Sequence, residues 1–232
     1  MTQRRPLYNP TTVPIKAVLS DAPMLDSSKL EADALRQRFK ESPIWQPEIT
    51  DESRLALASA GAQYRGKTGL TSAAVLVPLL MTEGGLQVLL TQRTDHLNDH
   101  AGQISFPGGR AEESDANPLA TALREAQEEI GLDAQYVEPL GNLPDYLTIT
   151  GYKVTPVVGL VSLDATYQAD PFEVADIFQV PLSFLMNPAN HQLREWEGET
   201  GTRQFYAMPY ENRFIWGATA GMLRNLYHYL SV

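Results

Sequence analysis

The sequence predicts a protein of the α/β or α+β class, in which helices and strands pack as a layered sandwich. Two apolar runs, residues 73–82 and 86–93, flank a Glu-Gly-Gly turn and indicate a hairpin of buried strands. Residues 118–130 and 218–230 carry apolar side chains at helical spacing, which predicts two amphipathic helices. A chain of 232 residues with 43% hydrophobic content can form one core, so a single domain with extensions is expected.

The chain is predicted to divide into an arm and helix at residues 1–69, packed on or preceding the core, and a core domain at residues 70–232. Residues 1–26 are rich in Pro, Thr and Asp and lack periodicity, so they are expected to form an extended arm. Such an arm could wrap a second copy of the chain, so a homodimer is one arrangement that the sequence allows.

The remaining elements are predicted from short apolar patterns bounded by Gly, Pro and polar turns. They are a helix within 29–39 with Ser27 or Ser28 as N-cap, a short helix at 51–60, strands at 103–106 and 154–161, a strand and turn at 135–143, a short helix or turn that starts at 170–171 and includes 173–178, a strand and helical turn at 180–186, a hairpin of 191–197 and 202–209, and a strand at 214–216. Pro156 predicts that its strand is bent or lies at an edge.

Composition excludes several classes of function. The net charge of −10 shows no general nucleic-acid footprint. The chain contains no cysteine, which excludes disulfides, thiolate metal sites and a cysteine nucleophile. No apolar run follows the arginines near the N-terminus, so this segment is not expected to be a secretory signal. No stretch approaches the length of a membrane span. A cytoplasmic protein that binds a small molecule, with no nucleic-acid or membrane partner, is expected.

The helix at 118–130 has clear start and stop signals. Asn117 suits the N-cap, Pro118 suits the first helical position, and Gly131 suits a left-handed stop. Leu119, Leu123, Ala126 and Ile130 share one apolar face, so the glutamates of the last turns are expected to point away from it.

Three of those glutamates lie within five positions. Glu125 and Glu129 are four residues apart and share one helix face, with Glu128 beside them. Clustered carboxylates suit Mg²⁺ or Mn²⁺, and Arg124 can pair with Glu128 to orient it. The preceding glycine loop, Gly108 and Gly109, allows close approach of the backbone to a metal or phosphate. An ordinary solvated acidic helix face accounts for the glutamate spacing equally well.

A wider pattern favours the metal interpretation. Gly109, five residues, Asp115, eight residues and then REAQEEIGL at 124–132 resemble the Nudix box. The second half matches the family's pattern at every specified position. Two departures occur: Asp115 stands where Glu is usual, and one extra residue precedes Arg124. We therefore do not assign Asp115 as a metal ligand.

The flanking residues resemble the coenzyme A pyrophosphatase branch of that family. The similar segments are LLTQR at 89–93, HAGQISFPGG at 100–109, and parts of 143–161 and 216–223. Thr94 and Asn98 depart from the branch pattern, where Ser or Ala and Arg are usual. The resemblance implies a Nudix-type α/β/α sandwich with a mixed sheet. It also implies hydrolysis of coenzyme A, dependent on Mg²⁺ or Mn²⁺, to 3′,5′-ADP and 4′-phosphopantetheine.

The same resemblance implies roles for individual residues. Glu125, Glu128 and Glu129 are the implied metal ligands, Arg124 orients one of them, and a carbonyl of Gly108 or Gly109 is a further candidate ligand. Glu173, with Asp170 behind it, is the candidate for an additional acid in a later loop, although an acid at a helix start that faces solvent explains either residue. Candidates for phosphate or substrate binding are Arg93, Gly108, Gly109, Arg110 and Lys67, although a surface salt bridge explains Arg93 equally well.

Other side chains are weaker candidates. His96 and His100 could act as bases, but loop histidines are more often polar surface. Tyr206, Trp196 and Trp216 could stack on adenine, but their strand spacing favours core packing. Two other functions stay open: hydrolysis of another nucleoside diphosphate derivative, such as ADP-ribose or a dinucleotide, and nucleotide binding without catalysis.

Overall fold

The computed structural model of the chain describes residues 9–63, 69–96, 102–198 and 201–232. Three of the side chains considered above, Lys67, Asn98 and His100, lie outside these ranges.

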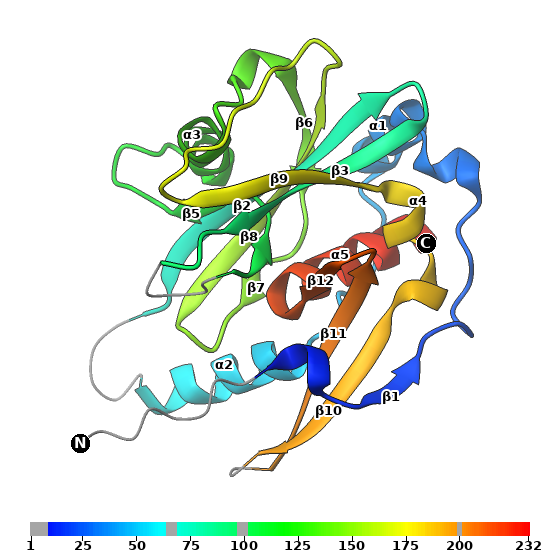
Figure 1. Cartoon of the computed structure of the whole chain (residues 1–232), viewed down its shortest axis with the longest axis vertical. Helices are drawn as coiled ribbons and strands as arrows, with labels where there is room; N and C mark the ends of the chain where they lie inside the picture. The colour runs from blue at the N-terminus through cyan, green and yellow to red at the C-terminus, as the bar shows by residue number, and fades with distance from the viewer. Residues whose placement is uncertain (1–8, 64–68, 97–101, 199–200) are drawn as a thin grey trace.

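A mixed sheet of eight strands forms the centre of the fold (Figure 1). Its strands are β2 Thr71–Thr82, β3 Gly85–Arg93, β4 Ile104–Ser105, β5 Gly108–Arg110, β6 Val137–Asn142, β7 Tyr146–Leu147, β8 Tyr152–Val161 and β9 Val174–Pro181. They run in the order β4–β3–β2–β8–β6, with β5 beside β2, β7 beside β8 and β9 beside β3. The β2 and β8 pair is parallel, and the other pairs are antiparallel.

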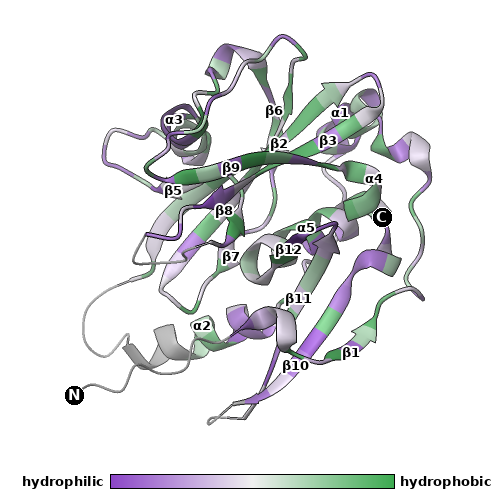
Figure 2. Ribbon diagram, in the orientation of Figure 1, coloured by the Kyte–Doolittle hydropathy of each residue, from purple (hydrophilic) through white to green (hydrophobic). Residues whose placement is uncertain are grey.

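Helices cover both faces of this sheet, which confirms the predicted α/β sandwich. α3, Pro118–Ile130, packs on one face, where Ala122, Ala126 and Ile130 meet strand residues such as Leu76 and Val157. α5, Gly217–Ser231, lies on the other face with a second apolar cluster. Figure 2 shows the hydrophobic colour concentrated on the central strands between these layers. Within the described ranges, no helix is long and apolar enough to cross a membrane.

A second, four-stranded sheet packs beyond α5. Its order is β1–β10–β11–β12, with bounds β1 Ile15–Val18, β10 Gln192–Gly198, β11 Gly201–Tyr210 and β12 Arg213–Trp216. The other helices are α1 Ala32–Glu41, α2 Asp51–Gln63 and α4 Leu182–Leu185, with short 3-10 turns at Pro10–Thr12, Ser27–Leu30, Ala134–Tyr136 and Pro188–Asn190. Because β1 pairs with β10, part of the predicted arm is a strand of this sheet.

Two local predictions about helices need correction. A short helix or turn was expected to start at Asp170 and continue through 173–178, but the turn ends at Glu173 and β9 then pairs with β3 along Val174–Pro181. The edge of β3 supplies backbone partners that outweigh the local pattern. Ser27 and Ser28 do not cap α1. They lie in a 3-10 turn whose N-cap is Asp26, and α1 begins at Ala32.

Two predictions about strands also need correction. Pro156 lies in a central strand, between β2 and the pair β6 and β7. Proline has no backbone N–H, but Pro156 lies opposite the gap between β7 and β6, where no ladder hydrogen bond is needed. Its carbonyl oxygen accepts a hydrogen bond from the Leu143 N–H at 2.9 Å. The Gly108–Gly109 segment is not a loop, because β5 pairs with β2 through it.

A partly buried polar network joins residue Glu48, between α1 and α2, to α5 and β11. The Glu48 carboxylate accepts hydrogen bonds from Tyr206, from Arg224 Nε at 3.1 Å and from His228 Nε2 at 2.8 Å. The backbone N–H of Glu48 donates a hydrogen bond to Asn225 Oδ1 at 2.8 Å. Burial raises the pKa of Glu48, but these bonds outweigh it and bring the pKa down to about 2.

Glu48 is therefore expected to contribute to acid stability. A carboxylate whose folded pKa of about 2 lies below its ordinary 4.5 stabilises the fold above pH 4.5, and this contribution is lost as pH falls toward 2. Glu48→Gln should lower the free energy of unfolding by about 2 kcal/mol at pH 7. Denaturation measured from pH 7 to pH 2 should show the wild-type and variant curves converging at low pH.

The exposed turn residue Glu83 provides a control, since Glu83→Gln removes an acid outside the network. A constant difference between wild type and Glu48→Gln across that pH range would contradict the assignment.

Candidate active site

α3 carries the acidic residues, and the predicted caps of this helix are confirmed. Asn117 Oδ1 accepts a hydrogen bond from the Ala120 N–H at 3.0 Å, and Pro118 occupies the first helical position. Gly131 ends the helix in the left-handed region at φ 62°. The helix therefore has a fixed start and end, which sets the rotation of its glutamates relative to the sheet.

Two glycines of β5 bring the sheet against this helix. Gly108 pairs with Val75 of β2, where a Cβ would lie 2.4 Å from the Ala74 carbonyl oxygen. A Cβ on Gly109 would lie 2.6 Å from the carboxylate of Glu125. A side chain at Gly108 would clash with the backbone of β2, and one at Gly109 would displace the Glu125 carboxylate. The two glycines thus allow β5 to lie directly against β2 and the acidic helix.

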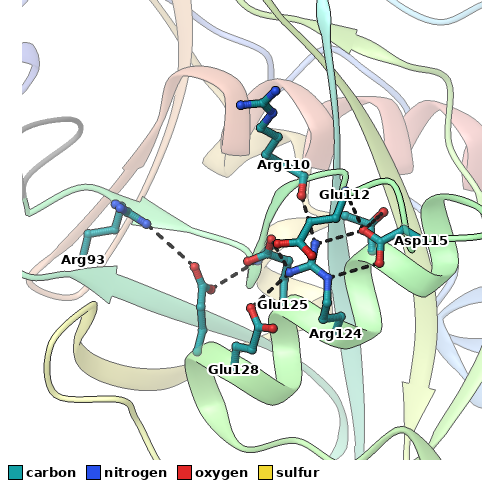
Figure 3. Close-up of polar contacts among 10 residues, drawn as sticks. Arg93, Arg110, Glu112, Asp115, Arg124, Glu125 and Glu128 are labelled. Carbon is teal, nitrogen blue, oxygen red and sulfur yellow. Dashed lines mark hydrogen bonds and ion pairs between the residues drawn. The ribbon is translucent and has the colours of Figure 1, made fainter.

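Arg124 lies at the centre of a network of charged groups (Figure 3). Its guanidinium donates to Asp115 at 2.9 and 3.1 Å, to Glu125 at 2.9 Å and to Glu128 at 3.1 Å. It also donates to the carbonyl oxygen of Arg110 at 3.0 Å. Four partners around one planar cation fix its position, and the cation in turn fixes the rotamer of Glu125. The predicted pairing of Arg124 with Glu128 is present.

Asp115 lies against Arg124 and is itself held in place. Its carboxylate accepts hydrogen bonds from the Glu112 N–H at 2.9 Å and from the Thr121 hydroxyl at 2.9 Å. The hydrogen bond from Arg124 is the largest of the effects that hold the pKa of Asp115 well below its ordinary value. Sequence reasoning left this residue without a role, although its spacing from Arg124 was visible.

Glu129 is the most enclosed acid of the site, with 6% of its surface exposed. One carboxylate oxygen accepts the Gly108 N–H at 3.2 Å, and the other lies 3.8 Å from Arg93 Nη1. Burial raises its pKa to about 7, against the lowering effects of Gly108 and Arg93. Helical spacing correctly places Glu129 off the apolar face, but it does not reveal that β5 covers the carboxylate.

A turn at residues 170–173 closes the site beside α3. The Asp170 N–H donates to the Glu129 carbonyl oxygen at 2.8 Å, and Asp170 Oδ1 accepts the Phe172 N–H at 2.8 Å. Asp170 therefore serves as a local turn former. The charge of Glu173 raises the pKa of both Glu125 and Glu129, which places its carboxylate within electrostatic reach of theirs.

The remaining candidates divide between the site and its surroundings. Arg93 reaches Glu129, and its Nε has no hydrogen-bond partner among the described residues. The guanidinium of Arg110 points away from the labelled carboxylates in Figure 3. His96 packs edge-to-face on Phe172 at 5.0 Å.

The three aromatic candidates lie in the second sheet. Tyr206 is buried, as core packing predicts, and bonds to Glu48. Trp196 and Trp216 are half-buried and both contact Phe205.

The carboxylates fit a divalent cation. Burial is the largest cause of the raised pKa of both Glu125 and Glu129 and outweighs their protein partners, so a bound cation would supply compensation that their charged forms have only in part. Oxygen donors are the ligands that Mg²⁺ and Mn²⁺ prefer. Within the described ranges, no three Asp, Glu or His side chains are already arranged around one point, and Arg124 hydrogen-bonds both Glu125 and Glu128.

Comparison with known proteins identifies the class. A family model described as the NUDIX domain matches residues 70–197. An Escherichia coli K12 protein described as the uncharacterized Nudix hydrolase NudL is 41% identical over 155 residues, covering 66% of this chain and 80% of the relative. The chain therefore contains a Nudix domain. It belongs to the Nudix hydrolase family and is a Nudix pyrophosphohydrolase, an enzyme class that generally uses divalent metal ions.

Solved structures with similar folds are more distant. The Nudix hydrolase RenU from M. smegmatis is 24% identical with a TM-score of 0.42, covering 50% of this chain and 73% of that one. The NUDIX domain of Shewanella oneidensis NrtR, solved with ADP ribose, is 24% identical with a TM-score of 0.40, covering 54% and 83%.

Gly109→Ala should reduce turnover without unfolding the protein. The new Cβ would displace the Glu125 carboxylate by about 1 Å, and misplacement on that scale costs on the order of 100-fold in rate. Turnover of a nucleoside diphosphate derivative and the melting temperature should be measured together. Gly69→Ala is the matched control, because no atom lies within 4 Å of its Cβ position. Equal turnover in both variants would contradict the close contact.

Asp115 and Arg124 should behave as one unit. Asp115→Asn and Arg124→Gln should each lower kcat, because each releases Glu125 from its fixed rotamer. The double variant should be little worse than Arg124→Gln alone, as expected for residues in one network. A double-mutant cycle on kcat measures this coupling, and strictly additive losses would show that Asp115 acts independently of Arg124.

Proposed function

We propose that the enzyme hydrolyses the diphosphate of coenzyme A or its derivatives, giving 3′,5′-ADP and 4′-phosphopantetheine or its acylated form. The observation that carries the hydrolytic assignment is the buried Glu129 carboxylate, which lies on α3 beside Glu125 and against the glycines of β5. The coenzyme A assignment is supported by the sequence of β3 and of the segment that leads into β5.

The metal is Mg²⁺ or Mn²⁺ in this proposal, held by Glu125, Glu128 and Glu129. Such an ion would supply positive charge that neutralises the diphosphate and would make a water molecule acidic at neutral pH. Phosphoryl chemistry of this kind depends mainly on positioning and on charge stabilisation.

The chain's own residues supply that positioning. Arg124 holds Glu125 in one rotamer, and the Gly108 N–H holds Glu129. Arg93 offers a phosphate oxygen a guanidinium whose ion-pair contact among the described residues is a long one, 3.8 Å to Glu129. The Glu173 carboxylate is the candidate to accept a proton from the attacking water, because its charge acts on both Glu125 and Glu129 and it does not belong to their helix.

A second substrate class has its own support. Asn98 stands where a basic residue is usual in the coenzyme A branch, which removes a positive charge that a 3′-phosphate or diphosphate could contact. This favours another nucleoside diphosphate derivative, such as ADP-ribose or a dinucleotide.

A substrate panel separates the two assignments. The purified chain with Mg²⁺ or Mn²⁺ is incubated with coenzyme A, acetyl-coenzyme A, ADP-ribose and a diadenosine polyphosphate, and products are resolved by chromatography. The proposal expects 3′,5′-ADP from coenzyme A at the highest kcat/KM. Intact coenzyme A beside cleaved ADP-ribose would overturn the substrate assignment and leave the hydrolytic one standing.

Glu129→Gln should abolish most of the activity. Removing one preorganised charge of an active site commonly costs about 100- to 1,000-fold in kcat. The melting temperature should not fall, because the amide retains the size of the carboxylate and avoids burying a charge. Glu113→Gln, at an exposed position before α3, is the control. Near-normal turnover of Glu129→Gln would remove Glu129 from the site.

A further inference from the structure

Phe172 is a large aromatic residue with 65% of its surface exposed, directly before Glu173 in the turn beside α3. Single exposed apolar residues are common in folded proteins, so exposure alone assigns no role. The position of Phe172 is unusual because its turn is bonded directly to α3, where the Asp170 N–H donates to the Glu129 carbonyl oxygen at 2.8 Å.

The backbone around Phe172 is fixed from two sides. On one side, Asp170 binds the Glu129 carbonyl oxygen through its N–H and the Phe172 N–H through its side chain, both at 2.8 Å. On the other side, Thr94 donates its hydroxyl to the Phe172 carbonyl oxygen at 2.9 Å and its N–H to that of Glu173 at 3.0 Å. An exposed aromatic residue is thus held on a rigid turn, where its loss of freedom costs little upon binding a ligand.

The ring of Phe172 is also supported. The imidazole of His96 lies edge-to-face against it, with centroids 5.0 Å apart and planes inclined at 61°. His96 follows Arg93 by three residues at the end of β3, and Arg93 reaches Glu129. Each ring therefore lies within three residues of a group that contacts Glu129, Arg93 in the case of His96 and Asp170 in the case of Phe172.

We propose that Phe172, supported by His96, is the platform on which the nucleobase of the substrate stacks. This inference rests on the proposed function, because it takes a nucleoside diphosphate whose phosphates lie at the carboxylates. A flat aromatic face binds any base, so the platform distinguishes nucleosides from base-free phosphates and discriminates weakly among bases. Thr94, which departs from the pattern of the coenzyme A branch, acts here as a positioning residue for the platform.

Calorimetric binding of two ligands to the full chain tests the platform without requiring turnover. The ligands are AMP and ribose 5-phosphate, which differ only by the base. Wild type should bind AMP more tightly. Phe172→Leu keeps apolar bulk but removes the aromatic face, and it should reduce the AMP advantage by about 5- to 100-fold while leaving the ribose 5-phosphate affinity unchanged. Phe172→Trp should retain the advantage.

Ile44→Ala is the matched control, because Ile44 is fully exposed in a different segment. Its AMP affinity should equal that of wild type. The inference is overturned if Phe172→Leu binds AMP like wild type, if wild type binds both ligands equally, or if wild type binds neither at millimolar concentration. Hydrolysis of the substrate panel is followed in parallel. If wild type shows a Phe172-dependent preference for AMP but cleaves no diphosphate, the stacking platform is supported and the proposed function is overturned.

Discussion

The close approach of α3 to β5 is the constraint on which the site depends. Gly109 leaves no room for a Cβ beside the Glu125 carboxylate, and Gly108 leaves none beside the backbone of β2. The same approach buries Glu129 and gives it the Gly108 N–H as a partner. Strand pairing, helix packing and the electrostatics of the acids therefore have one common cause, which is the absence of side chains at two consecutive positions.

Charge compensation within the site is uneven. Arg124 serves Asp115, Glu125 and Glu128 together, so that one cation faces three carboxylates. Glu129 has a backbone N–H and a distant guanidinium, and the nearby Glu173 adds further negative charge. The excess negative charge lies in a region of low dielectric, where unpaired charge is costly. A divalent cation is the simplest species that would balance it, because burial, the largest cause of the raised pKa values of Glu125 and Glu129, disfavours their charged forms.

Local sequence signals were sufficient to predict α3, the hairpin β2–β3 and the layered fold. Helix caps, apolar periodicity and a glycine turn each depend only on residues that are close together in the sequence. Partners distant in sequence could not be predicted. β9 forms because β3 offers it an edge, and Pro156 is tolerated in a central strand because two short strands meet opposite it. The pairing of Asp115 with Arg124 and the burial of Glu129 depend on how β5 packs against α3. The spacing of residues within α3 alone does not predict this packing.

The most direct test of this account is cation binding to the full chain, measured by the electron paramagnetic resonance of free Mn²⁺ and by the shift in melting temperature. Wild type should bind Mn²⁺ and gain thermal stability, with about 2.7 kcal/mol expected at a concentration 100 times Kd. Glu125→Gln and Glu129→Gln should each weaken the binding, and Glu113→Gln should not. Unchanged Mn²⁺ affinity in both site variants would contradict the central claim that these two carboxylates form the metal site.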